Sequence, residues 1–271
     1  MRGWRQERPC LRDGGRNGRR LGTAVQHHAG HSAVDRCRAS DQLRSRRIGL
    51  PNSLVIFDLD GTLFRTDSVT VPAVQESFKD FGLSPPVPDV ILGFIGQPIS
   101  ALARWARETC PAESVDRLMA EIDRRELELV QTAGRLFEGA VEALAALRND
   151  YGSLAICTNG QSRYVHDVLD ATQIRQHFDL VRYRREDDIS KTGMVRDVVR
   201  RLNAQRAVVV GDRADDVRAA KDNGLGSVGA GYGFGSPGEL DDADAVAESI
   251  GHVPDLVRSV FEGLGQGSGR K

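Results

Sequence analysis

Short runs of apolar residues recur along the chain from residue 54 onward, and small or polar residues follow each run. The first run, at 54–57, reads Leu-Val-Ile-Phe and leads directly into Asp58. Apolar runs of this length between turn signals are typical of strands that are buried on both faces. We predict five such strands, at 54–57, 154–157, 178–181, 207–210 and 227–229.

Apolar residues at helical spacing lie between several of these runs. Tyr164, Val165, Val168 and Leu169 share one face of a predicted helix, and the stretch 194–202 repeats the same spacing. Strands that alternate with helices of this length form βαβ units with right-handed crossovers. The pattern therefore predicts an α/β fold, with a parallel sheet covered by helices on both faces.

The segment from residue 64 to residue 138 breaks this alternation. Its apolar positions follow a helical period at 74–81, 99–105 and 115–122, and a Pro-rich stretch at 85–88 separates the first helix from the others. We predict that one all-helical module is inserted after the first strand.

The first 50 residues differ in composition from the rest of the chain. They hold twelve Arg, no Lys and four acidic residues, a net charge of +8, whereas the whole chain carries −1. Such a segment gains too little from burial to offset its ordering entropy. We expect residues 1–51 to form a disordered basic tail. A dispensable extension is the favoured interpretation, and a basic arm for nucleic acid is the alternative. Residues 263–271 are expected to be flexible.

Cysteine spacing and hydropathy indicate the cellular compartment that the sequence predicts. The four Cys show no CxxC spacing, which argues against a zinc site or a disulfide framework and favours a reducing compartment. No stretch approaches the ~20 apolar residues of a membrane helix, and the N-terminus lacks the apolar region of a secretory signal. We expect a cytoplasmic monomer or homodimer with no membrane partner, and nucleic acid as a partner only through the tail.

Two carboxylates stand at the end of the first predicted strand. Asp58 and Asp60 are two residues apart and would point the same way on an extended backbone. One could attack an electrophile while the other handles protons, and Gly61 permits a sharp turn after them. A polar turn or a helix cap would explain the same residues, so this pair decides nothing by itself.

Two further clusters stand where a strand ends or a helix begins. Thr158 and Asn159 follow the strand at 154–157, a place that suits either a phosphate oxygen or an ordinary N-cap. Lys191 precedes a helix, where its charge opposes the helix dipole unless an anion lies between them; an exposed lysine is the alternative. Because parallel strands end at one edge of a sheet, these groups can converge.

The last cluster carries three carboxylates. Asp212, Asp215 and Asp216 follow the strand at 207–210, and they repel one another unless a hard cation is near. Carboxylate oxygens with retained waters suit Mg²⁺. An exposed acidic N-cap is the alternative. We predict a magnesium site at this edge of the sheet.

In this order the four clusters resemble the motifs of the haloacid dehalogenase-like (HAD) superfamily of phosphohydrolases. The matching residues are Asp58-x-Asp60-Gly61-Thr62, Thr158, Lys191 and Gly211-Asp212-x-x-x-Asp216. The resemblance implies a Rossmann-like parallel sheet core at 52–66 and 139–262, with an inserted all-helical C1-type cap at 67–138. The segments 216–224 and 231–236 are similar to the phosphoglycolate phosphatase-like branch.

The resemblance also implies a role for each motif residue. Asp58 would be the nucleophile that forms an aspartyl-phosphate, and Asp60 the general acid and base. Mg²⁺ would be held by Asp58, Asp212 and the main-chain carbonyl of Asp60. The equatorial oxygens of the phosphoryl group would be held by Thr158, the Asn159 backbone and Lys191, with Asp216 and Thr62 in support. The substrate would be a small phosphorylated metabolite of the phosphoglycolate, sugar phosphate or nucleotide type.

Alternatives to a phosphatase stay open from sequence. A phosphomutase of the same superfamily would keep these residues, and an inactive core could act as a binding module. Asp60 argues against a haloacid dehalogenase, which has no need of it as a proton shuttle. Three departures from the usual branch pattern leave the motif residues intact: Arg65 stands where an acid is usual, Thr192 follows Lys191 in place of Pro, and Glu138 precedes Gly139 in place of Pro.

Overall fold

The computed structural model describes residues 52–266. The predicted basic tail at 1–51 and the last five residues, 267–271, therefore lie outside the described part of the chain. The flexible C-terminus was expected to begin at residue 263, and this is wrong for 263–266, which form the end of the helix Val253–Gln266. Among the helices of the described part, none is both long enough and apolar enough to cross a membrane.

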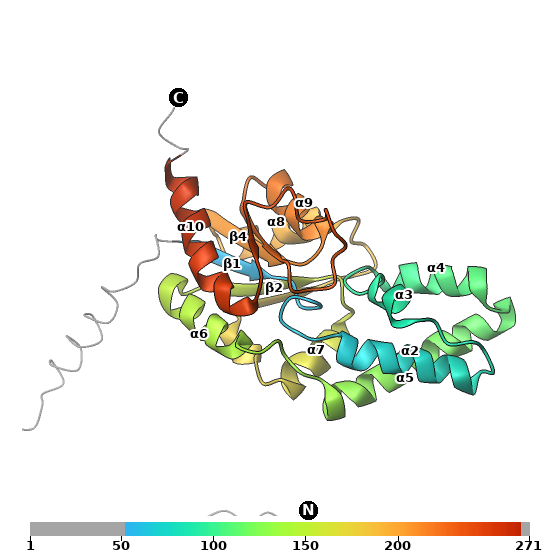
Figure 1. Ribbon diagram of the computed structural model, residues 1–271. Helices are drawn as coiled ribbons and strands as arrows, with labels where there is room; N and C mark the ends of the chain where they lie inside the picture. The colour runs from blue at the N-terminus through green and yellow to red at the C-terminus, as the bar shows by residue number, and fades with distance from the viewer. Residues whose placement is uncertain (1–51, 267–271) are drawn as a thin grey trace, which may run out of the picture. The chain divides into compact units, whose positions relative to one another are not determined.

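A six-stranded parallel sheet forms the centre of the fold (Figure 1). The strand order is β3-β2-β1-β4-β5-β6, so β1 and β4 are central neighbours. The strands are β1 (Ser53–Phe57), β2 (Leu154–Thr158), β3 (Leu180–Tyr183), β4 (Arg206–Gly211), β5 (Gly226–Ala230) and β6 (Ala245–Ala247). The parallel α/β fold predicted from the alternation of runs is confirmed.

Helices cover both faces of this sheet, and the side chains of β1 show how. Val55 and Phe57 belong to one buried cluster, while Leu54 and Ile56 belong to another. Successive side chains of a strand point to opposite faces, so the uninterrupted apolar run at 54–57 is what a two-sided core requires. Figure 1 shows α8 and α9 above the strands and α6 below them. The helices of the core are α6 (Ala140–Tyr151), α7 (Ser162–Ala171), α8 (Lys191–Arg201), α9 (Ala214–Asp222) and α10 (Val253–Gln266).

Between β1 and α6 the chain forms four helices without a strand, as the helical periodicity predicts. They carry a hydrophobic cluster of their own, in which Phe78, Leu102, Leu118 and Ile122 are buried together. We call this set, α2 to α5, the helical insert. Its helices are α2 (Asp67–Asp80), α3 (Pro88–Leu92), α4 (Ile99–Thr109) and α5 (Ala112–Ala133).

The structure differs from the sequence prediction at the edges of the sheet. The strand expected at 178–181 begins two residues later, because a 3₁₀ turn at Arg175–His177 ends with Phe178 as its cap. Strand β6 was not predicted. It has only three residues, too few for a period-two pattern to stand out.

Candidate active site

Three carboxylates lie close together at the end of the central strands β1 and β4. Asp58 follows β1 and Asp212 follows β4, and the Asp58 amide donates to the Val210 carbonyl at 2.8 Å. Asp216 reaches the same place from the first turn of α9. Oxygens of Asp58, Asp212 and Asp216 lie within 4.8 Å of one another, and all three residues are buried. We call these three residues the carboxylate cluster.

Lys191 is the cation that faces this cluster. It is the first residue of α8, and its Nζ lies 2.5 Å from Asp58 Oδ1 and 2.5 Å from Asp216 Oδ1. A positive charge at a helix N-terminus is unfavourable by itself, and the two carboxylates compensate for it. Burial alone would lower the pKa of Lys191, but Asp216 and Asp58 raise it, so the ammonium stays charged.

The carboxylate cluster fits a divalent cation. Asp58 Oδ2 and Asp212 Oδ1 are buried and have no hydrogen-bond partner among the described residues. Burial, followed by repulsion from Asp58 and Asp216, raises the pKa of Asp212 well above its ordinary value. Three ionised carboxylates beside one ammonium would leave two uncompensated negative charges. Buried charges of this kind are costly unless an ion pairs with them, and carboxylate oxygens are the ligands of hard divalent ions.

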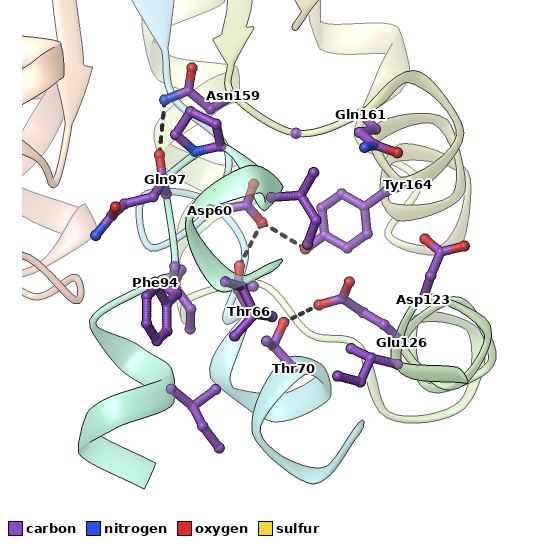
Figure 2. Close-up of a pocket in the computed structure, with 18 of the residues that line it drawn as sticks. Asp60, Thr66, Thr70, Phe94, Gln97, Asp123, Glu126, Asn159, Gln161 and Tyr164 are labelled. Carbon is purple, nitrogen blue, oxygen red and sulfur yellow. Dashed lines mark hydrogen bonds between the residues drawn. The ribbon is translucent and has the colours of Figure 1, made fainter. Parts of the chain in front are cut away.

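Asp60 lies outside the cluster and has hydrogen-bond partners of its own. Its Oδ1 accepts hydrogen bonds from Thr66 Oγ1 at 2.7 Å and from Tyr164 Oη at 2.6 Å (Figure 2). Thr158 Oγ1 makes a long contact of 3.4 Å with Asp60 Oδ2. Burial raises the pKa of Asp60 above its ordinary value, and the Tyr164 hydrogen bond opposes this rise. The two carboxylates of the first motif therefore occupy distinct environments, one beside a lysine and one beside a phenol.

A sharp turn follows these two carboxylates. Gly61 has a positive φ of 77°, and a Cβ at this position would lie 2.3 Å from Asp212 Oδ2. Any side chain here would strain the backbone and strike the cluster. The sequence prediction of a turn at Gly61 is confirmed, and close approach to Asp212 adds a second reason for glycine.

Thr158 and Asn159 stand at the end of β2, next to the central strand β1. Thr158 Oγ1 accepts from the Gly160 amide at 3.1 Å. The Asn159 side chain donates to the Gly96 carbonyl of the helical insert at 2.9 Å and accepts from Arg184 at 2.7 Å. This side chain therefore joins the core to the loop before α4, which leaves the main chain of Asn159 as the group for the predicted phosphate contact.

Two predicted neighbours stand elsewhere. Asp215 was expected at the sheet edge with the other acids, and this is wrong: its side chain is 52% exposed and pairs with Arg218 at 3.4 Å. Asp215 and Asp216 are consecutive in α9, so they point about 100° apart and only one can face the cluster. Thr62 is buried; its carbonyl accepts from the Tyr232 hydroxyl at 2.9 Å.

Sequence reasoning missed Tyr164 and Thr66 as partners of Asp60. Tyr164 fell on the apolar face of a predicted helix, and that assignment to α7 is correct. Its hydroxyl was the only signal that the residue does more than pack. A buried phenol needs a hydrogen-bond partner, but the sequence does not say which.

A family model described as haloacid dehalogenase-like hydrolase matches residues 55–230, more than half of the chain. The chain belongs to the haloacid dehalogenase-like hydrolase family. The predicted membership is thereby confirmed, and with it the assignment of the chain as an enzyme.

Named relatives of this haloacid dehalogenase-like hydrolase differ in what they are said to do. A phosphoglycolate phosphatase of Cupriavidus necator is 30% identical over 222 residues, which cover 78% of this chain and 95% of the relative. A probable phosphatase of Dickeya dadantii, IndB, is 32% identical over 224 residues, 76% of this chain and 95% of the relative. The structure of protein tyrosine kinase A of Mycobacterium tuberculosis matches with a TM-score of 0.63 and 26% identity, over 75% of this chain and 97% of that one.

Proposed function

We propose that this hydrolase cleaves small phosphate monoesters in two steps, through an aspartyl-phosphate on Asp58. The observation that carries the proposal is the pairing of environments at the end of β1. Asp58 is 2% exposed and held by Lys191, while Asp60 sits two residues away in a separate network with Tyr164. Two carboxylates in different surroundings can take different roles in one reaction. Similarity to two named phosphatases supports the same activity.

In the first step an oxygen of Asp58 attacks phosphorus, and the bond to the alcohol oxygen breaks. Asp60 donates its proton to that leaving oxygen. In the second step Asp60 takes a proton from water, whose oxygen attacks phosphorus and cleaves the aspartyl-phosphate, which restores the Asp58 carboxylate and the protonated Asp60. Burial raises the pKa of Asp60, which favours the protonated form that the first step requires.

The phosphoryl oxygens need donors that are already in place. We assign this role to the Thr158 hydroxyl, the Asn159 main chain and the Lys191 ammonium, which the fold brings to the same sheet edge as Asp58. Asp216 positions Lys191 through their 2.5 Å contact. Thr62 lies in the buried turn after Asp60 and supports it.

Mg²⁺ is the proposed cofactor. Asp58, Asp212 and the main-chain carbonyl of Asp60 would hold it, and Asp216 completes the carboxylate cluster. Bound there, the ion would neutralise the repulsion between an anionic nucleophile and an anionic ester. Asp60 contributes no carboxylate to this proposed metal site, because its side chain is committed to Thr66 and Tyr164.

The helical insert is proposed to act as a cap. Asp58 is 2% exposed and Lys191 is 4% exposed, so an ester cannot reach them without a movement of the surrounding structure. Opening for exchange and closing to exclude water is a common task of such modules. On this proposal, the core comprises 52–66 and 139–262, and the cap 67–138.

The test is release of inorganic phosphate from para-nitrophenyl phosphate with Mg²⁺. Asp58→Asn should reduce turnover by at least about a hundredfold. Asp215→Asn is the matched control, since it makes the same chemical change on an exposed side chain and should keep full activity. Free phosphate also separates a phosphatase from a phosphomutase, which returns the group to its substrate. Activity of Asp58→Asn above a hundredth of wild type would overturn the assignment.

A further inference from the structure

A cavity of about 280 Å³ lies between the helical insert and the core, beside Asp60 (Figure 2). The core side of its lining includes Asp60, Asn159 and Tyr164, which belong to the proposed reaction site or contact it. The cavity is therefore continuous with the place where the leaving oxygen takes its proton. Its volume lies near the lower end of the roughly 300–1,000 Å³ of small-molecule sites, so its occupant is small.

The insert lines this cavity mainly with apolar side chains. They come from α3, α4, α5 and the loop before α4, and include Ile91, Phe94, Leu102, Met119 and Ile122. Contact between an apolar wall and the apolar surface of a ligand favours binding, whereas such a wall does not stabilise a charged group.

The charges that line the cavity are all negative. Its acidic residues are Asp60 on the core side and Asp123 and Glu126 on α5, and none of its lining residues within the described chain is Lys, Arg or His. Two arginines lie near the cavity but are already engaged. Arg213 pairs with Glu239 at 3.0 Å, and Arg184 binds Asn159 and the Asp188 carbonyl.

The Glu126 carboxyl shows that the cavity wall disfavours a negative charge. Its carboxylate accepts a hydrogen bond from Thr70 (Figure 2), and no ion pair to it exists among the described residues. Burial, with a smaller effect from Asp60 and Asp123, raises the pKa of Glu126 to about 7. The cavity therefore already disfavours one negative charge, and a second anion from a ligand would meet the same penalty plus repulsion.

We propose that this cavity holds the alcohol part of the substrate and selects phosphate esters whose alcohol has an apolar body and no further anionic group. Asp123 and Glu126 are the residues that exclude carboxylates and second phosphates. This inference rests on the proposed phosphatase function. It also separates the chain from its relative named phosphoglycolate phosphatase, because phosphoglycolate carries a carboxylate next to the ester carbon.

The experiment compares two esters of the same shape with the full-length protein and Mg²⁺. In 2-phosphoglycolate the ester CH₂ bears a carboxylate, and in isobutyl phosphate it bears an isopropyl group, in which two methyl groups take the place of the two carboxylate oxygens. We expect kcat/KM for isobutyl phosphate to exceed that for 2-phosphoglycolate by at least tenfold. Equal values, or a preference for 2-phosphoglycolate, would overturn the inference and leave the phosphatase proposal standing.

Variants of the lining residues then test which side chains cause the preference between the two esters. Glu126→Gln and Asp123→Asn, singly and together, should raise the ratio of kcat/KM for 2-phosphoglycolate over that for isobutyl phosphate, by roughly tenfold in the double variant. Glu128→Gln is the control: it removes the same charge from α5, but its side chain is 64% exposed and lies outside the cavity. A ratio that the cavity variants leave unchanged would contradict the assigned role of these acids.

Failure of the underlying function gives a different result. If wild type releases phosphate from neither ester nor from para-nitrophenyl phosphate, the phosphatase proposal fails and the inference fails with it. If only the choice between the two esters comes out reversed, the chemistry stands and the chemical class of the substrate is wrong.

Discussion

Glu126→Gln is expected to stabilise the fold at pH 8 and to have much less effect at pH 5. The side chain is partly buried in the cavity wall, and burial raises its pKa from an ordinary value of 4.5 to about 7. A carboxyl group whose pKa is higher in the folded state favours folding while it is protonated. That contribution is complete below pH 4.5 and is lost as the pH rises through 7.

The size of the effect follows from this shift. Each unit of pKa difference corresponds to about 1.4 kcal/mol, so the ionised glutamate costs the folded state at most about 3 kcal/mol at pH 8. At pH 5 the folded state is protonated and the unfolded state only partly ionised, which leaves less than about 1 kcal/mol. Glutamine is neutral at both pH values, and its carbonyl can still accept the hydrogen bond from Thr70.

The assay is urea unfolding of wild type and variant at pH 5 and pH 8. The quantity of interest is the change in their stability difference between the two pH values, about 2 kcal/mol, because it cancels any fixed effect of the substitution. Glu128→Gln on the exposed face of α5 should show no such change. A stability difference of equal size at both pH values would refute the reasoning, since it would mean that the carboxyl is not held in an unfavourable environment.

The remaining predictions concern the proposed catalytic and metal sites. Tyr164→Phe removes the 2.6 Å hydrogen bond that stabilises the charged form of Asp60. It should lower kcat by roughly tenfold and move the limb of the pH–rate profile that reports Asp60 to higher pH; Tyr151→Phe, on α6, should do neither. Chelation with EDTA should abolish turnover and Mg²⁺ should restore it, whereas Ca²⁺ should serve poorly because its larger, looser coordination misplaces the nucleophile. Asp212→Ala should raise the Mg²⁺ concentration for half-maximal activity or remove activity, and full turnover in excess EDTA would contradict a metal-dependent mechanism.

The sequence allows the centre of the fold to be predicted better than its edges. Both faces of β1 are buried, so its four apolar residues in a row carry a clear signal. At the sheet edge β6 has a partly exposed, three-residue run that resembles a loop. Strand β3 also has only one buried position of four, and its start depends on where the preceding 3₁₀ turn ends. The apolar pattern thus becomes weaker toward the edges of the sheet, where fewer positions are buried.

The carboxylate cluster follows the same logic with one exception. Asp58 and Asp212 could be placed because each directly follows a central strand, and neighbouring parallel strands end together. Spacing alone could not tell Asp215 from Asp216, because both stand in the first turn of α9 and only the rotation of that helix decides which one faces Lys191. The family resemblance, not the pattern of residues, is what singled out Asp216. A helix start fixes the rotation only when its exact first residue is known.

The cavity wall could not be predicted at all, and the reason bears on how this family divides chemistry and selectivity. The proposed reactive groups follow strands of one sheet, whose register fixes them to one another. Glu126 and Ile91 come from helices α5 and α3, whose packing depends on side chains spread over the whole insert. Nothing in the spacing of an acidic residue on a helix of 22 residues says that it faces a cavity rather than water. On our proposals, similarity to a phosphatase of named substrate indicates the chemistry of the residues at the sheet edge, while the ester that is accepted depends on the charges that the insert places over Asp60.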